Sequence, residues 1–225
     1  MRRSDQWERS AREDAPTARE YRDLRRAATN VDQFSLQCEF IIRTMGELGL
    51  RAGEVSHIEG DWVDLDRGTL RIPTYSDCSC GYCKSQAELA VSYRPDETDL
   101  ETELSKRWKP KLEASARTVP YNFDEGLVDL YDRFFAEYDD FPRSRVVINR
   151  RVKRVAEAAE LVEPDEIYPH AFRGHAAKYH ARSGVGAHQL REFMGWSTVD
   201  AAMKYIKMVA PDVEREFNRI HKGPY

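Results

Sequence analysis

One stretch near the C-terminal end limits the fold more strongly than any other part of the chain. His170 and Arg173 lie three positions apart, so on a helix both side chains occupy one face. The letters GVGAHQLREFMG that follow predict a turn and a short amphipathic helix that ends at Gly195. Trp196 and Tyr205 come next. The stretch therefore brings an imidazole, a guanidinium, an indole and a phenol together within one short part of the chain.

Those four side chains suit the cleavage of a phosphodiester. A guanidinium binds phosphate oxygens through a planar fork of N–H donors. An imidazole moves protons near neutral pH, and a phenol can act as a covalent nucleophile. We interpret Arg173, His170 and Tyr205 in these three roles, with the indole N–H of Trp196 as a further donor to phosphate.

The order of these residues resembles the C-terminal signature of the tyrosine recombinase (phage integrase) family. That signature is H-x-x-R, then G followed by H or W, then a nucleophilic tyrosine. Trp196 stands where most members have histidine, and Gly174 stands where a second histidine often follows the arginine. The resemblance implies the catalytic-domain fold of the family, which is mainly α with a small antiparallel β-sheet (α+β).

A second arginine box follows a helical pattern over residues 31–50. The string GLRAGEV there resembles the family's first box, in which an arginine contacts the scissile phosphate. The resemblance makes Arg51 that phosphate clamp and Glu54 the residue that holds it or lines the site. From the residues alone, Arg51 and Glu54 could also be a surface ion pair on one helical turn.

Strand patterns over residues 62–65, 69–72 and 116–119 predict the small sheet, because apolar and β-branched residues alternate there beside Gly and Pro. In the family, a lysine precedes the last of these strands, which reads R-x-V-P. Lys111 fits that spacing better than Lys109, which we hold in reserve. Such a lysine can protonate a leaving oxygen, although an exposed loop lysine is the plain alternative.

An insert of about residues 74–107 opens this hairpin and contains the string DCSCGYCK. Three thiolates at C-x-C-x-x-C spacing can bind one metal ion, and structural zinc takes four ligands. The three would be Cys78, Cys80 and Cys83. The fourth ligand could be Cys38, His57 or a residue of another chain; otherwise the cysteines are unpaired surface thiols. The zinc would be structural, since the proposed chemistry requires no cofactor.

Residues 144–161 form the most basic stretch and predict a helix that contacts DNA, with a solvated helix face as the alternative. The DNA-contacting candidates are Arg145, Arg150, Arg151, Lys153 and Arg154, and Arg143 lies just before them. The net charge of −4 is unusual for a DNA enzyme, so a basic face has to be local. Adaptation to high salt, as in an archaeal source, is another explanation of that charge.

We divide the chain into a charged tail or helix at residues 1–30, of which 17–27 could form a solvated helix, and a catalytic domain at 31–225. The family commonly has a separate N-terminal clamp domain, for which this chain has no room. A last helix is expected after Pro211. No apolar run is long enough to span a membrane and no secretory signal begins the chain, so we expect a cytoplasmic, nucleoid-associated protein, or one in the host cell if a virus carries it.

The resemblance implies a site-specific recombinase or integrase of a mobile element, such as a virus or plasmid. It would cut and rejoin double-stranded DNA through a 3′-phosphotyrosyl intermediate and self-associate on DNA as a dimer or tetramer. Two alternatives remain. One is a nicking–closing enzyme like the type IB topoisomerases, and the other is a non-catalytic DNA-binding regulator derived from an integrase.

Overall fold

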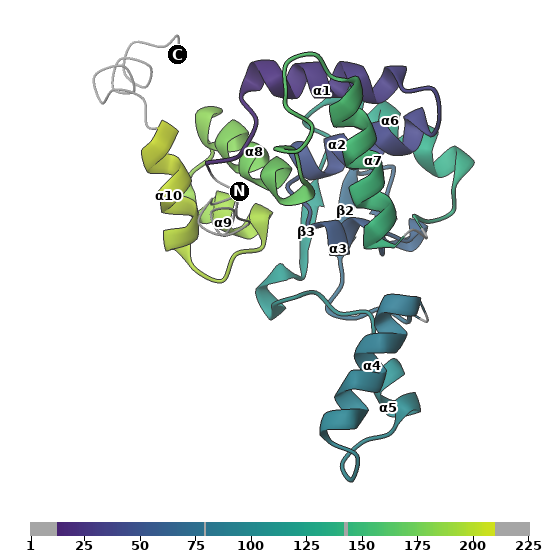
Figure 1. The fold of residues 1–225 in the computed structure, drawn as a ribbon. Coiled ribbons are helices and arrows are strands. Elements are labelled where there is room, and N and C mark those ends of the chain that lie inside the picture. Colours follow the sequence, from purple (N-terminus) through teal and green to yellow (C-terminus); the bar gives the residue numbers. More distant parts are fainter. Residues whose placement is uncertain (1–12, 79, 142–143, 210–225) are drawn as a thin grey trace, which may run out of the picture.

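The computed structural model describes residues 13–78, 80–141 and 144–209, and these confirm a mainly helical fold with a small antiparallel sheet (Figure 1). The helices are α1 (Ala18–Asn30), α2 (Ser35–Gly46), α3 (Ala52–Val55), α4 (Gly81–Tyr93), α5 (Leu100–Leu104), α6 (Glu125–Glu137), α7 (Arg145–Ala158), α8 (Pro169–Arg182), α9 (Ala187–Met194) and α10 (Val199–Val209). The strands are β1 (Val63–Asp64), β2 (Thr69–Ile72) and β3 (Arg117–Pro120). None of the described helices is long and apolar enough to cross a membrane.

Helix α2 forms the centre of the main hydrophobic core, with α1, α6, α7 and α8 packed around it. The Phe40 ring stacks on Phe134 of α6 with 3.8 Å between ring centroids, and Tyr131 lies 5.0 Å from Phe40. Complete burial of one such ring contributes roughly 1.5–3 kcal/mol. The aromatic stripe of α6 is therefore core packing, as its helical spacing predicts.

Helix α1 is part of the core, so the expectation of a solvated helix over residues 17–27 was wrong. Thr17 caps the helix in a capping box: its Oγ1 accepts the Glu20 backbone N–H, and its own backbone N–H donates to the Glu20 carboxylate. Tyr21 and Leu24 are buried on the side that faces α2 and α8. The buried carboxylate of Asp23 accepts two backbone N–H groups from the segment after α7. The abundance of arginines concealed this buried face.

The sheet has the order β1–β2–β3, and both neighbouring pairs are antiparallel. Leu70 pairs with Val119 and Ile72 pairs with Arg117. Leu70, Ile72 and Val119 are buried against the core, which fixes the register because a slip of one residue would expose them. The sheet therefore holds Arg117 in one place beside α9.

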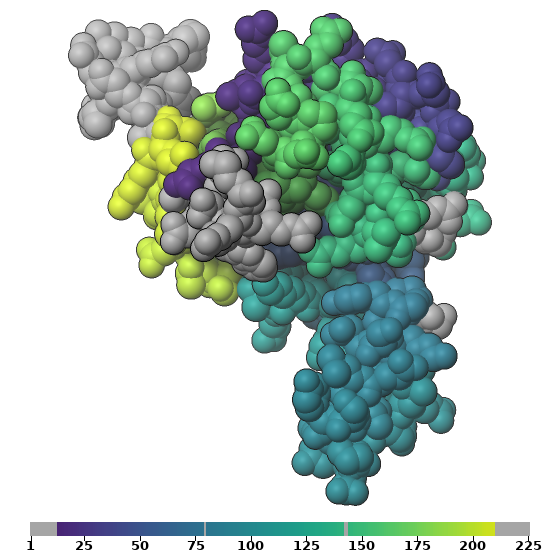
Figure 2. All heavy atoms as spheres, in the orientation of Figure 1, coloured from purple at the N-terminus to yellow at the C-terminus, as the bar shows by residue number. Residues whose placement is uncertain are grey.

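The long connection from β2 to β3 carries α4 and α5, which project from the body as a lobe (Figures 1 and 2). In this lobe Glu103 is buried between Lys106, Arg107 and Arg94. At the opposite end α8, α9 and α10 share a second, smaller apolar cluster rich in alanine. Arg143 and the helix expected after Pro211 lie outside the described residues.

Candidate active site

The junction of α2 and α3 positions the first two site residues. Gly49 has φ +68°, a left-handed conformation that favours glycine, and the chain then turns into α3. Arg51 is the N-cap of α3, and Glu54 lies in its first turn. The Glu54 carboxylate accepts the Arg51 backbone N–H at 2.9 Å and its Nη1 at 2.7 Å. The arginine is thus held by backbone and side chain together.

Glu54 is only 2% exposed and lies among three arginines. Arg117 donates to both of its carboxylate oxygens at 3.2 Å. Burial alone would raise the pKa of Glu54, but the charges of Arg117, Arg173 and Arg51 outweigh it and lower the pKa to about 2. Glu54 is therefore ionised at neutral pH and holds the arginines together.

Arg173 extends from α8 into the space between α3 and the end of α9. It is buried and donates to the carbonyl oxygens of Gly49 and Met194. Burial and the nearby charge of Arg51 lower the pKa of Arg173 to about 9, so it stays a cation at neutral pH. Two fixed carbonyl partners define the plane of its guanidinium.

Gly195 allows the tight approach of α9 to this arginine cluster. It has φ +60°, and a Cβ atom there would lie 2.8 Å from Nη1 of Arg117. Its carbonyl accepts Nη2 of Arg51 at 3.3 Å. The glycine of the G-W pair is thus required by both backbone conformation and close packing.

Trp196 lies between Arg173 and Tyr205. The centre of the Arg173 guanidinium is 5.6 Å from the Trp196 ring centroid, and the Tyr205 ring stacks on Trp196 with centroids 5.3 Å apart and an interplanar angle of 11°. Tyr205 is half-buried on α10 and is not among the residues that line the neighbouring cleft. The phenol therefore adjoins the arginine cluster through Trp196.

An open cleft of about 1080 Å³ runs past the arginine cluster. The predicted catalytic and DNA-contacting residues that line it, with the reserve lysine Lys109, are Arg51, Glu54, Lys109, Lys111, Arg145, His170 and Arg173. The candidate metal ligands His57, Cys78 and Cys80 line it as well. The His170 ring is exposed at the cleft rim. Its pKa is lowered, first because surrounding protein desolvates part of the ring and then because Arg173, Arg51, Lys111 and Arg145 repel its charged form. Neutral imidazole therefore prevails near pH 7.

Both candidate lysines lie in the connection that leads to β3, and both are exposed. Lys111 is among the charges that act on His170, whereas Lys109 is not among its main influences. Both lysines line the cleft, and the choice of Lys111 over Lys109 stays a prediction.

The basic side chains of α7 fall into two groups, those that are exposed and those that contact other residues of the protein. Arg145, at its first turn, is exposed beside the cleft, and Arg150 is exposed as well. Arg151 and Arg154 lie over the Phe34 ring, with guanidinium carbons 3.5 and 5.6 Å from its centroid. The remaining cation, Lys153, pairs with Asp165 at 3.2 Å.

Sequence reasoning did not assign Arg117 to the site, although it used this residue to locate the last strand. Arg117 donates to the carbonyls of Phe193 and Ser115 as well as to Glu54. Ser115, which is buried, also accepts Nη1 of Arg51. An arginine in a strand does not reveal from the sequence which charge it will meet.

Three of the four cysteines cluster around a histidine, and the fourth lies apart from them. Cys78, Cys80 and Cys83 lie together with His57, and their ligand atoms are all within 4.8 Å of one another. Cys38 is buried in α2, close enough to Arg151 and Arg154 to be affected by their charge. Of the fourth ligands considered from the sequence, which were Cys38, His57 or a residue of another chain, the structure brings His57 to the cluster.

The fold is similar to solved structures of tyrosine recombinases. A crystal structure of XerA recombinase has a TM-score of 0.60 at 15% identity, and the match covers 94% of this chain and 66% of the other. The Tn1549 transposon integrase in complex with transposon right end DNA has a TM-score of 0.63 at 14% identity, with coverages of 93% and 66%. The same integrase with circular intermediate DNA gives 0.63 at 15% identity, with coverages of 92% and 66%. The chain thus spans just under two thirds of each of these.

No match was found among curated proteins. The model of the phage integrase family, however, matches residues 17–210, which is most of the chain and includes every site residue described above. On that match, together with the fold, the chain belongs to the phage integrase family.

Proposed function

We propose that this protein cuts and rejoins double-stranded DNA through a 3′-phosphotyrosyl intermediate on Tyr205, as a site-specific recombinase or integrase of a mobile element. One observation carries the proposal. Arg51 and Arg173 converge on the buried Glu54 at the wall of an open cleft, with Trp196 and Tyr205 adjoining. This arrangement suits a phosphate that gains negative charge while a phenol attacks it.

In the reaction, the Tyr205 oxygen attacks phosphorus and the bond from phosphorus to the 5′-oxygen breaks. Arg51 and Arg173 stabilise the charge that develops on the non-bridging oxygens. Their orientation is fixed before DNA binds, because Glu54 and backbone carbonyls already hold both guanidinium groups. Preorganised donors of this kind typically contribute about 10²–10³-fold to the rate for each donor.

Two further residues move protons. Neutral His170 accepts or positions the proton of the Tyr205 phenol, and its lowered pKa keeps it in the neutral form that this step needs. Lys111 gives a proton to the departing 5′-oxygen from its exposed position on the cleft wall. The 3′-phosphotyrosine retains the energy of the broken bond, so attack by a 5′-hydroxyl completes the exchange with no nucleotide cofactor and no metal in the balance.

Double-stranded DNA would lie across the cleft, with Arg145 and Arg150 of α7 as the exposed cations for its phosphates. Arg151, Lys153 and Arg154 have intramolecular partners, so we propose a smaller share of DNA contact for them. A cytoplasmic protein that assembles on DNA as a dimer or tetramer fits this proposal, with residues 31–225 as the catalytic domain.

A nicking–closing enzyme would use the same residue set and remains the second candidate. The two differ in selectivity: a recombinase cuts at one recurrent sequence, whereas a nicking–closing enzyme cuts at many. A DNA-binding regulator would bind specifically without cutting. The intact set of Arg51, Arg173 and His170 along one cleft, with Tyr205 stacked on the adjoining Trp196, favours an enzyme.

Covalent adducts distinguish these functions. The protein and a Tyr205→Phe variant are produced in the source cell, noncovalent complexes are removed with detergent, and attached DNA is sequenced. We expect adducts at one recurrent sequence with the unaltered protein and none with Tyr205→Phe. Adducts scattered over the genome would support the nicking–closing candidate. Specific footprints without any adduct would refute the enzyme and leave a regulator.

A further inference from the structure

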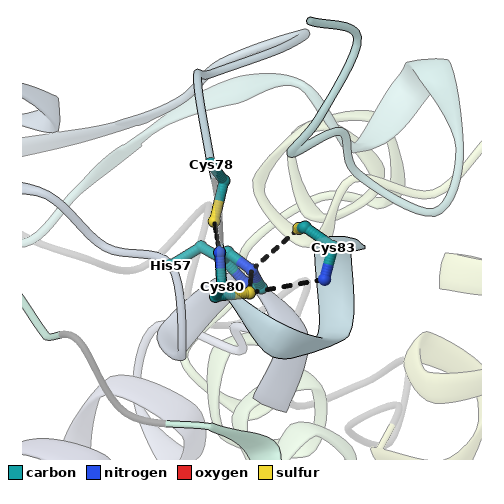
Figure 3. Close-up of side chains that lie close together, drawn as sticks. All are labelled: His57, Cys78, Cys80 and Cys83. Carbon is teal, nitrogen blue, oxygen red and sulfur yellow. Dashed lines mark hydrogen bonds between the residues drawn. The ribbon is translucent and has the colours of Figure 1, made fainter. Parts of the chain in front are cut away.

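The cysteine-rich start of the insert comes together with a histidine from the body of the protein (Figure 3). Cys80 Sγ lies 3.4 Å from Nε2 of His57, and Cys83 Sγ lies 3.5 Å from the same nitrogen. In tetrahedral zinc sites, bonds of about 2.0–2.3 Å place neighbouring ligand atoms about 3.6–3.8 Å apart. All four ligand atoms, including Sγ of Cys78, lie within 4.8 Å of one another. They are therefore close to tetrahedral spacing.

The histidine is held in the orientation that a metal ligand requires. Its Nδ1 lies 2.7 Å from the Gly53 carbonyl, a group that can only accept a hydrogen bond. The proton must therefore be on Nδ1, so Nε2 presents its lone pair to the three sulfur atoms. A backbone carbonyl on the other ring nitrogen is the usual way in which proteins orient a zinc-bound imidazole.

The sulfur atoms are also supported by the local backbone. Cys80 N–H donates to Sγ of Cys78 at 3.5 Å, and Cys83 N–H donates to Sγ of Cys80 at 3.4 Å. Cys80 caps α4, so its Sγ and that of Cys83, one helical turn later, share one side of the helix start. The local fold thus gathers three sulfur ligands on one point.

We propose that His57, Cys78, Cys80 and Cys83 bind one zinc ion that fastens the insert to the body of the protein beside α3. Four protein ligands leave no open position, so the ion is structural and does not take part in catalysis. This inference stands independently of the proposed cleavage reaction.

The ion would hold more than the start of α4. The His57 ring stacks on Trp108 at 5.1 Å, and Trp108 in turn lies 5.3 Å from Trp62 of the body. The Trp108 carbonyl also accepts the Ser76 backbone N–H, which joins the two stems of the insert, the segment that enters it at Ser76 and the segment that leaves it at Trp108. A zinc-bound His57 would therefore fix both stems, one of which continues directly to Lys109 and Lys111.

Metal content and cobalt spectra test the proposal on the full chain. We expect one zinc per purified chain under reducing conditions. Replacement by Co²⁺ should give intense visible bands of tetrahedral cobalt and a near-ultraviolet sulfur-to-cobalt band. Cys80→Ser and His57→Gln should each weaken zinc binding by more than the roughly 10–100-fold typical of changes in supporting residues. Cys38→Ala and His188→Gln are the matched controls and should keep the metal, since Cys38 is in the core and His188 is exposed on α9.

Hydrogen exchange on the unaltered protein is a second readout, which does not depend on whether a variant folds. Removing zinc from the unaltered protein with a chelator should speed hydrogen exchange across residues 74–93 and leave α8 unchanged. A chain that carries no zinc and gives no cobalt spectrum would overturn the proposal. So would an unchanged spectrum in His57→Gln, which would remove the link between insert and body.

Discussion

The arginine cluster and the helix that carries Tyr205 are built in different ways. The guanidinium groups of Arg51, Arg117 and Arg173 each donate to several fixed acceptors around buried Glu54. Helix α8, which carries Arg173, buries residues from Ala171 to Ala177 without a break. Helix α10 completely buries only Ala202. The arginines that would stabilise charge are therefore held tightly by packing and hydrogen bonds. The helix that carries the predicted nucleophile is packed more loosely.

This difference has a physical consequence. Segments with few buried apolar side chains open at a lower free-energy cost than the core. The small alanine-rich cluster beneath α10 contributes less hydrophobic stabilisation than the aromatic core around α2. We therefore expect the phosphate site to persist when α10 is displaced, while displacement of the arginine cluster would disturb the whole fold.

The largest effect is expected from Arg173→Lys. Lysine keeps the positive charge but loses the planar fork that contacts Gly49 and Met194 together. We expect adduct formation to fall by about 10²–10³-fold, in line with loss of a preorganised donor. Arg182→Lys, at the exposed end of the same helix, should have no effect. Equal activity of the two variants in a gel assay of adducts would remove Arg173 from the site.

Glu54→Gln tests whether the cluster holds the fold. It leaves three arginines around a neutral group, and loss of one partner of a buried ion pair costs roughly 3–5 kcal/mol. The pKa of Glu54 is lowered from 4.5 to about 2, so its stabilisation is complete above pH 4.5 and is lost as the pH falls toward 2.

Urea unfolding at several pH values measures this difference. The stability gap between the unaltered protein and Glu54→Gln should be widest near pH 7 and should narrow below pH 4.5. Glu157→Gln, which alters an exposed residue of α7, is the control. A gap that does not change with pH would mean that the Glu54 charge is unimportant.

Trp196→Ala tests the more loosely packed region, which is helix α10 with Tyr205. It removes the ring that stacks on Tyr205 and adjoins Arg173, and such ring pairs contribute about 0.5–1.5 kcal/mol. We expect adduct formation to fall about 10-fold or less. Hydrogen exchange should become faster in α10 and remain slow in α8, and Trp196→Phe should restore part of both. Faster exchange in α8 as well would show that the two helices are not separately stabilised.

The smallest effect concerns the pH dependence. Because the pKa of His170 is lowered from 6.5, the cleavage rate should rise with pH with a midpoint below 6.5 and level off above that midpoint if neutral His170 is the base. Arg145→Gln removes one of the repelling charges and should move this rise to higher pH, most clearly at low salt. His170→Gln should abolish the rise. A rise that persists in His170→Gln would assign it to another group.

The comparison also explains which parts of the site could be predicted from the sequence. His170 and Arg173 lie on α8, Tyr205 lies on α10, and Trp196 lies in the short connection before α10, so their order and spacing along the chain indicated a site. Arg117 could not be found in this way, because its role depends on the pairing of Ile72 with Arg117 and on the close approach of Gly195. A contact that depends on strand register, or on the backbone of a glycine far away in the sequence, leaves no pattern in the residues around it.

The same limit applied to α1 and to the metal cluster. The many arginines of α1 concealed the buried positions Tyr21 and Leu24, which only the packing against α2 and α8 reveals. The choice between Cys38 and His57 as a metal ligand was open because both are distant in sequence from the cysteine string. The hydrogen bond from His57 to Gly53 settles its orientation, and that bond depends on the turn of α3.

The central claim is that Tyr205 is the group that becomes joined to DNA at the arginine cluster. The most direct measurement is mass spectrometry of the covalent adduct after nuclease and protease digestion. The account predicts one peptide, which contains Tyr205 and carries a nucleotide on its phenol. A nucleotide on any other side chain, or adducts that persist in Tyr205→Phe, would contradict the account.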